Sequence, residues 1–325
     1  MKINTVIMHW LLLCAPFTCL QPSFAASYPE RPIRFIVPFP PGGGTDTGSR
    51  IIMQKLGEHF KQQIVIDNRG GAAGIIGTEL GAKAAPDGYT IMMGNIGTHA
   101  INVCLYAKLP YDPVKDFAPV TQAAGLPLFL LVNPTVQATS VKALIELVKA
   151  RPGQFNYSTS GSGSSMHVAA ELFQSMAHVK INHIPYKGGG PAIVDLIAGQ
   201  VSVSFATVLE TVGQVKAGKL RALAVTSAKR SRAAPDLPTM SEAALPGYES
   251  ISWIGVFAPA RTSKEIVALL NREIVRVLNT PEVNTRLLEQ GAEPIGNSPE
   301  QFAAVQKADI AKYSKLLRES GVKPE

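Results

Sequence analysis

FIVPFPPGGGTD, residues 35–46, decides the fold class, because an apolar run leads there directly into a glycine-rich turn. Glycines let the backbone approach a ligand closely, and a helix that follows such a turn presents free N–H groups. Ile52, Leu56 and Phe60 recur at helical spacing behind the turn. The stretch therefore predicts a strand, a ligand-binding loop and a helix.

Short β-rich runs alternate with helical segments along the rest of the chain. Ser140 is expected to cap one helix, which Pro152-Gly153 ends. Alternation of this kind predicts an α/β fold with largely parallel sheets. The expected strands are residues 33–37, 64–67, 90–93, 128–132, 156–158, 181–184, 201–205 and 220–225.

The last part of the chain changes character and is expected to be helical. Ser263 precedes an amphipathic segment that continues to Leu278, and Pro281 and Pro299 each begin a further helical stretch. Proline at the first helical position is a typical start signal, because its missing N–H would have no partner there. The sequence therefore predicts a helical C-terminal region.

The N-terminus carries the features of a secretion signal. Lys2 and an apolar run at 6–20 precede small residues at Ser23 and Ala25, so residues 1–26 are expected to be a signal peptide. The run is shorter than the roughly 20 residues that a membrane helix needs. Cys14 or Cys19 as a lipid anchor is a weaker alternative, because small residues do not precede them. We expect an exported, soluble protein.

Composition further limits the class of protein to which this chain can belong. The chain has 325 residues, a length greater than one hydrophobic core usually organises, so two domains are favoured. Hydrophobic residues make up 46% of the chain. The net charge of +7 comes from scattered basic residues, and the dense run at 229–232 is expected to be a solvated loop, so no nucleic-acid partner is expected. Cys104 is the one cysteine beyond the signal peptide, which leaves no internal disulfide there.

Four turns rich in glycine or hydroxyl residues follow expected strands, at residues 40–46, 94–99, 158–167 and 186–191. In open α/β sheets, ligands bind beyond the carboxyl ends of the strands, next to helix N-termini. One such turn alone is typical of a tight turn with a capped helix. Four in one chain favour a neutral, donor-rich site for an anion.

Individual side chains in these turns allow more than one interpretation. Asp46 is expected to cap the first helix, where a carboxylate interacts favourably with the helix dipole. Lys187 is either a partner for an anionic ligand or a solvated side chain. His99, His167 and His183 lack metal-ligand spacing with Cys or carboxylates, so neither a metal nor a cofactor is expected.

An exported hydrolase or isomerase that uses Ser165 or His167 is the alternative from another class. The two residues are two positions apart and do not face each other on a helix. No Gly-x-Ser-x-Gly elbow is followed by an acid and a base in the expected order. We expect a protein that binds its ligand without chemistry.

Further motifs make the chain similar to a known family. Five short motifs appear in order together with the loops at residues 38–46 and 160–167. They are YPERPI (28–33), DNRGGAAG (67–74), AAPDGYT (84–90), LPYDPVKDFAPV (109–120) and HIPYKG (183–188). Together they resemble the Bug-type periplasmic solute-binding proteins, the extra-cytoplasmic receptors of tripartite tricarboxylate transporters. The resemblance spans nearly the whole chain after the signal peptide.

The resemblance implies an α/β two-domain periplasmic-binding-protein (Venus-flytrap) fold that closes on a small ligand. Two chain crossings are expected near Ala124 and Ile254, so that residues 27–124 and 254–325 form domain 1 and 125–253 form domain 2. The helical C-terminal region then returns to domain 1. A clamp of this kind works as a monomer, and the membrane components of such a transporter become candidate partners.

Family members hold a ligand carboxylate through backbone amides and bridging waters. The resemblance, together with the turn chemistry, assigns ligand contacts to Phe39, Gly43, Gly44, Thr45, Asp46, Thr98, Ser160, Gly163, Ser164, Ser165, His167, Lys187 and Thr207.

Residues 204–210 depart from the family pattern, because Thr207 fills a position where relatives often carry an amide. Glu210, if it lies near the site, disfavours a second carboxylate or favours a ligand with an amine. The expected function is a periplasmic receptor for a small carboxylic acid, with a sensing-only receptor of the same fold as a further alternative. Aromatic acids, amino acids, dicarboxylates and citrate-like acids all stay open as ligands.

Overall fold

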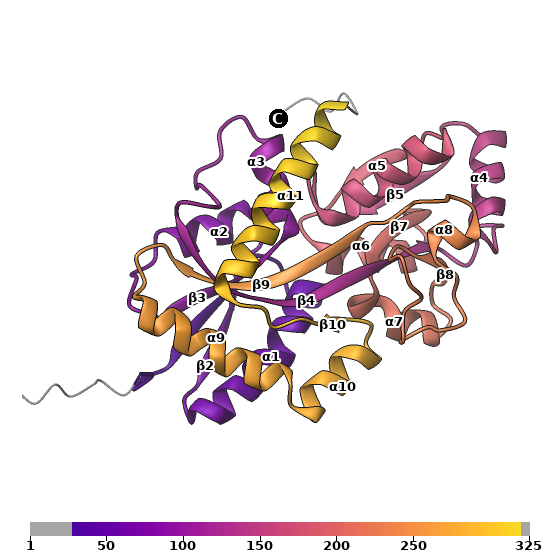
Figure 1. The fold of residues 1–325 in the computed structure, drawn as a ribbon. Coiled ribbons are helices and arrows are strands. Elements are labelled where there is room, and N and C mark those ends of the chain that lie inside the picture. Colours follow the sequence, from indigo (N-terminus) through magenta and orange to yellow (C-terminus); the bar gives the residue numbers. More distant parts are fainter. Residues whose placement is uncertain (1–27, 320–325) are drawn as a thin grey trace, which may run out of the picture.

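The computed structural model describes residues 28–319, and the signal peptide expected at residues 1–26 lies outside this range. Two lobes are joined by two long strands, as Figure 1 shows. The first lobe contains the strands β1 (Ile33–Val37), β2 (Ile64–Asn68) and β3 (Thr90–Asn95), and β1 pairs in parallel with both of the others.

Helices cover both faces of the first lobe's sheet. Phe35 and Val37 point into a core with Leu56 of α1 (Gly44–Phe60), whereas Ile36 points to the other face. This alternation is the period-2 pattern of a strand that is buried on both sides. The smaller elements between the strands are η1 (Ala72–Gly74), α2 (Ile75–Ala82), η2 (Gly97–Ile101) and α3 (Asn102–Leu105).

The two long strands are β4 (Phe117–Val132) and β9 (Ile251–Pro259). Residues 117–127 of β4 pair antiparallel with β9, and β9 also pairs antiparallel with β3. Residues 128–132 of β4 pair with β7 and β8 of the second lobe. The two lobes therefore share a continuous hydrogen-bonded strand.

The second lobe repeats the α/β arrangement, with β5 pairing in parallel with β6 and β7. Its own core includes Phe129, Tyr157, Phe173 and Phe205. The strands are β5 (Asn156–Thr159), β6 (Asn182–Pro185), β7 (Val203–Thr207) and β8 (Arg221–Val225). The helices are α4 (Val141–Ala150), α5 (Ser165–Ala177), α6 (Gly189–Ile197), α7 (Val208–Lys216) and α8 (Met240–Ala243).

The C-terminal region returns to the first lobe, as expected, and α11 lies across that lobe in Figure 1. Its elements are α9 (Lys264–Leu278), α10 (Pro281–Glu289), β10 (Glu293–Pro294) and α11 (Pro299–Glu319). The predicted starts are confirmed: Ser263 Oγ accepts the N–H of Ile266, and Pro281 and Pro299 begin their helices. Phe302 of α11 is fully buried against Trp253 and Phe257 of β9.

Two strand segments were not expected from the sequence. Residues 117–127 contain Pro119, Gly125 and Pro127, which are poor strand formers, and 251–259 was expected only as a crossing. The prediction of largely parallel sheets therefore holds for β1–β3 and β5–β7, whereas β4, β8 and β9 pair antiparallel.

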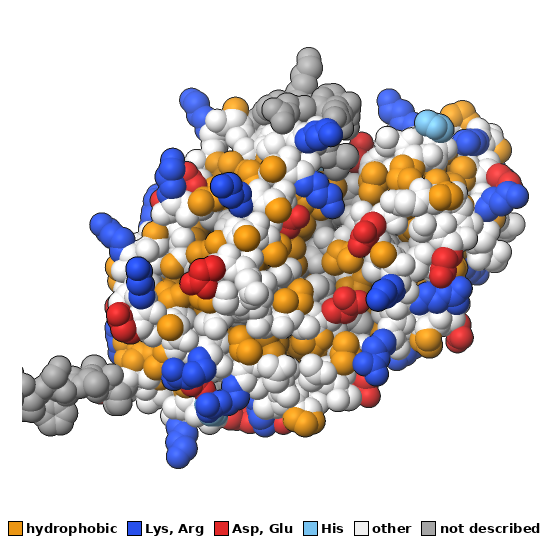
Figure 2. Space-filling model, in the orientation of Figure 1, with side chains coloured by type: hydrophobic (Ala, Val, Ile, Leu, Met, Phe, Trp, Pro, Cys, Tyr) orange, Lys and Arg blue, Asp and Glu red, His pale blue; other side chains and the backbone are white. Residues whose placement is uncertain are grey.

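Figure 2 shows the molecule from the same side, with basic side chains spread over this face and a hollow between the lobes. Among residues 28–319, none of the helices combines the length and the apolar character that crossing a membrane requires.

Candidate functional site

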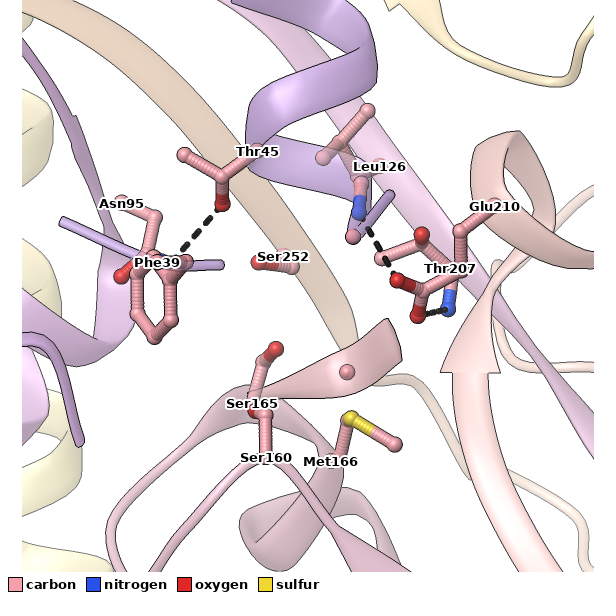
Figure 3. Close-up of a pocket in the computed structure, with 13 residues that line it drawn as sticks. Phe39, Thr45, Asn95, Leu126, Ser160, Ser165, Met166, Thr207, Glu210 and Ser252 are labelled. Carbon is pink, nitrogen blue, oxygen red and sulfur yellow. Dashed lines mark hydrogen bonds between the residues drawn. The ribbon is translucent and has the colours of Figure 1, made fainter. Parts of the chain in front are cut away.

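A cavity lies between the lobes, where the carboxyl ends of several strands meet (Figure 3). It holds about 390 Å³ of empty space. Its wall is formed by Phe39, Gly43, Gly44, Thr45, Asn95, Leu126, Ser160, Ser165, Met166, Gly189, Thr207, Glu210 and Ser252. None of these residues is a Lys or an Arg.

The glycine-rich loop positions the first-lobe side of the cavity. Gly42 has φ +89°, a left-handed conformation that glycine adopts without strain, and Gly43 is the extended residue before α1. Thr45, in the first turn of α1, has its hydroxyl oxygen 3.2 Å from Asn95 Nδ2, which donates to it. The loop thus turns the start of α1 toward the cavity.

The second-lobe side is built from the starts of three helices. Ser165 and Met166 are the first residues of α5, Gly189 is the first residue of α6, and Thr207 precedes α7. Helix N-termini carry unpaired N–H groups and a partial positive charge. Together with α1, four helix N-termini therefore face one cavity.

Glu210 links the two lobes. Its Oε2 accepts the N–H of Gly44 in the first lobe at 2.8 Å, and its Oε1 accepts the N–H of Thr207 in the second lobe at 3.1 Å. Burial raises the pKa of the Glu210 carboxyl, and these two N–H groups act against that rise. Figure 3 shows both hydrogen bonds as dashed lines.

Gly44 of the first lobe and Thr207 of the second lobe also lie close together within the wall. A Cβ atom on Gly44 would lie 2.4 Å from Thr207 Oγ1, so only glycine fits there. Thr207 is the N-cap residue of α7 and forms a capping box with Glu210, three residues ahead.

The family model for the tripartite tricarboxylate transporter family receptor matches residues 49–322. The chain belongs to this family. The receptor is 39% identical to protein BugT of Bordetella pertussis over 303 residues, which are 93% of each chain. The sequence resemblance to the Bug-type proteins is thereby confirmed.

Solved structures agree in fold over almost the full length. The structure of R. palustris Rpa4515 with adipate has a TM-score of 0.90 and 40% identity, covering 92% of this chain and all of the other. MatC (Rpa3494) from Rhodopseudomonas palustris with bound malate has a TM-score of 0.84 and 33% identity, covering 89% and 100%. The receptor therefore has the periplasmic-binding-protein fold, and it is a periplasmic solute-binding receptor, not an enzyme.

The structure brings many of the sequence-predicted contact residues to the cavity wall. These are Phe39, Gly43, Gly44, Thr45, Ser160, Ser165 and Thr207. Asn95, Leu126, Met166, Gly189 and Ser252 also line the wall but were not predicted. A signal existed for Asn95 and Gly189, since both lie in the glycine-rich turns, whereas Leu126 and Ser252 lie on strand segments that the sequence pattern did not show.

Asp46 lies outside the wall, although it was predicted as a ligand contact. Its carboxylate accepts the N–H of Gly42 at 3.0 Å and hydrogen bonds from Arg50 and Asn68. Burial alone would raise the pKa of Asp46, but these three donors hold it below its usual range. Asp46 thus stabilises the shape of the glycine-rich loop from the first turn of α1. The prediction that Asp46 caps this helix is wrong, because Gly43 is the N-cap residue and no side chain caps the helix there.

The other predicted contacts also lie outside the wall. Thr98 closes a turn with Asn95, Ser164 caps α5 by accepting the N–H of His167, and Lys187 is an exposed side chain. His167 Nδ1 accepts the N–H of Gly163, so the ring supports the loop before α5. These residues shape the loops that carry the wall.

Two of the histidines pack against each other. His167 stacks on His183, with ring centroids 4.3 Å apart, and burial lowers the pKa of His167 to about 4. Within residues 28–319, no group of three His, Cys, Asp or Glu side chains is arranged to hold a metal ion. The wall supplies hydroxyl groups, backbone N–H groups and one carboxylate, which suit the binding of a polar small molecule.

Proposed function

We propose that the receptor binds a small carboxylic acid in the cavity between its lobes and delivers it to the membrane components of a tripartite tricarboxylate-type transporter. The observation that carries this proposal is the convergence of the N-termini of α1, α5, α6 and α7 on one cavity. Helix N-termini bind carboxylates through oriented N–H groups, without a positively charged side chain.

The relatives support the same ligand class. Rpa4515 has a structure with adipate and MatC has one with malate, and both ligands are carboxylic acids. In this receptor the proposed direct contacts are Gly43, Gly44, Thr45, Ser160, Ser165 and Thr207, which line the cavity.

Ligand entry requires the lobes to move apart, because Gly44 of the first lobe is hydrogen-bonded to Glu210 of the second lobe at the cavity wall. We propose that the lobes divide as expected near Ala124 and Ile254, on β4 and β9, and that these strands act as the hinge. We also propose that the receptor works as a monomer, since the wall is complete within one chain.

A thermal-shift screen tests the proposal. The mature protein is unfolded, refolded to remove any ligand that it carried, and screened against adipate, malate, citrate, benzoate and glutamate, with glucose as the control. An acid at about 100 times its Kd should add roughly 2.7 kcal/mol, which is a rise of several degrees for a protein of this size. Calorimetry then gives the Kd, and chromatography checks that the ligand is recovered unchanged.

Gly43→Val, with Gly213→Val as the matched control, locates the binding. Gly43 lines the cavity, whereas a side chain at Gly213 on α7 would meet nothing within 4 Å. Only Gly43→Val should abolish the shift. A shift from glucose but from none of the acids would contradict the proposal, and equal binding by both variants would contradict the location.

Delivery to a transporter is tested by uptake. A strain that lacks the receptor should lose uptake of the radiolabelled ligand and regain it with the wild-type gene. Normal uptake together with loss of ligand-dependent gene expression would instead support the sensing-only receptor.

A further inference from the structure

One end of the cavity already contains a carboxylate. Glu210 lines the wall, and its two oxygens accept N–H groups from Gly44 of α1 and Thr207 of the second lobe. A Cβ atom on Gly189, at the start of α6, would lie 2.7 Å from Oε2. The Glu210 carboxylate thus accepts N–H groups at the starts of α1 and α7 and lies close to the start of α6.

No cation balances this carboxylate. Among the ion pairs of residues 28–319 none includes Glu210, and the wall contains no Lys or Arg. Glu210 also lines a second, wider groove next to the cavity, between Pro40 and Val194. A ligand group at this end therefore meets the oxygens of the Glu210 carboxyl group, which accept hydrogen bonds and line both spaces.

Donors at another part of the wall are unused. The hydroxyl groups of Ser160 and Ser165 line the cavity and make no hydrogen bonds to other described residues. Figure 3 shows these two serines on a different side of the open space from Glu210. A ligand carboxylate at the start of α5 would leave the other end of the ligand facing Glu210.

We propose that Glu210 makes the receptor select acids that carry a hydrogen-bond donor, above all an ammonium group, at the end opposite their carboxylate, over dicarboxylates of the same length. This inference rests on the proposed function and names the ligand class of the same cavity. A second carboxylate would lie beside Glu210 and be repelled, whereas an ammonium group would pair with it. Selection then comes from repulsion as much as from attraction.

Matched ligand pairs test the proposal by calorimetry at one pH and ionic strength. 5-Aminopentanoate and adipate both have four methylene groups between their ends, and 4-aminobutanoate and glutarate both have three. In each pair the wild-type receptor should bind the amino acid about tenfold more tightly or better. Pentanoate and butanoate, which lack the second charged group, should fall between the two members of their pairs.

Glu210→Gln keeps the shape and removes the charge, and it should lower the ratio of the two affinities in each pair about tenfold or more. The ratio cancels any change in lobe closure that affects both ligands alike. Glu146→Gln is the control, because Glu146 is exposed on α4 and its replacement changes the net charge equally. This control should leave the ratio unchanged.

Two results would overturn the inference while leaving the proposed function intact. One is tighter wild-type binding of the dicarboxylates, which needs no variant to be observed. The other is an affinity ratio in Glu210→Gln equal to that of the wild type. If none of the acids binds, including those of the earlier screen, then it is the proposed function that fails.

Discussion

Gly44 of the first lobe and Thr207 of the second lobe are so close that a Cβ atom on Gly44 would lie 2.4 Å from Thr207 Oγ1 and 3.2 Å from its Cβ. These two residues lie on different lobes, so we expect their contact to form when the lobes close around the cavity. Both also line its wall. Closure of the lobes thus requires that residue 44 has no Cβ atom.

Gly44→Ala should weaken ligand binding by about tenfold or more while the fold stays intact, because the added methyl group keeps the lobes apart. Calorimetry with the ligand found in the screen measures the loss. Gly213→Ala is the control: the site is an exposed helical glycine with nothing within 4 Å, so this change should raise helix stability by about 0.5–1 kcal/mol and leave binding unchanged. Equal affinities of the two variants would contradict the closed geometry.

Phe302→Ala should destabilise the receptor by about 3–5 kcal/mol, because a fully buried aromatic ring that anchors α11 is lost. The ring packs edge-on against Trp253, with centroids 5.2 Å apart. Urea unfolding measures the free energy. Lys307→Ala, at an exposed position of the same helix, should cost much less. A cost below about 1 kcal/mol for Phe302→Ala would mean that α11 is not anchored there.

Stability should fall as the pH drops below 6.5, because burial lowers the pKa of His99 to about 3 and that of His167 to about 4. The unfolded chain takes up protons near pH 6.5 that the folded chain does not, so this stability is present above 6.5 and is lost toward the folded values. Each histidine should lower the free energy of unfolding by about 2 kcal/mol between pH 6.5 and pH 5.

Thermal unfolding from pH 7.5 to 5 measures this pH dependence. His167→Gln should show a shallower fall than the wild type, although the variant is less stable at pH 7.5. His178→Asn is the control, because His178 is exposed, with φ 52°, a conformation that Asn tolerates. The same slope in His167→Gln and wild type would argue that His167 is not buried in its neutral form.

Asp46→Asn should cost about 2 kcal/mol at pH 7, since the Asp46 carboxylate accepts hydrogen bonds from Arg50, Asn68 and Gly42. The pKa of Asp46 is lowered from 3.8, so the stability it contributes is present above that value and is lost as the pH falls through the lowered pKa. The difference between wild type and variant should therefore shrink in acid. Asp236→Asn, at an exposed site, is the control for thermal unfolding.

The sequence alone predicted the elements whose signals are local. Ser140 and Ser263 cap their helices by accepting an N–H group three residues ahead, and Pro281 begins α10, because each signal acts within one helical turn. The glycine-rich loop was predicted for the same reason. Its Gly43, Gly44 and Thr45 indeed line the cavity.

Only the tertiary structure decided the long strands and the full composition of the wall. Residues 117–127 become a strand because β9, more than a hundred positions later in the chain, supplies their hydrogen bonds, which overrides the weak strand propensity of Pro119 and Gly125. Leu126 and Ser252 reach the cavity through that pairing. The place of Glu210 was likewise beyond the sequence, since the Gly44 N–H that meets its carboxylate lies in the other lobe, and pairing across such a distance leaves no local pattern.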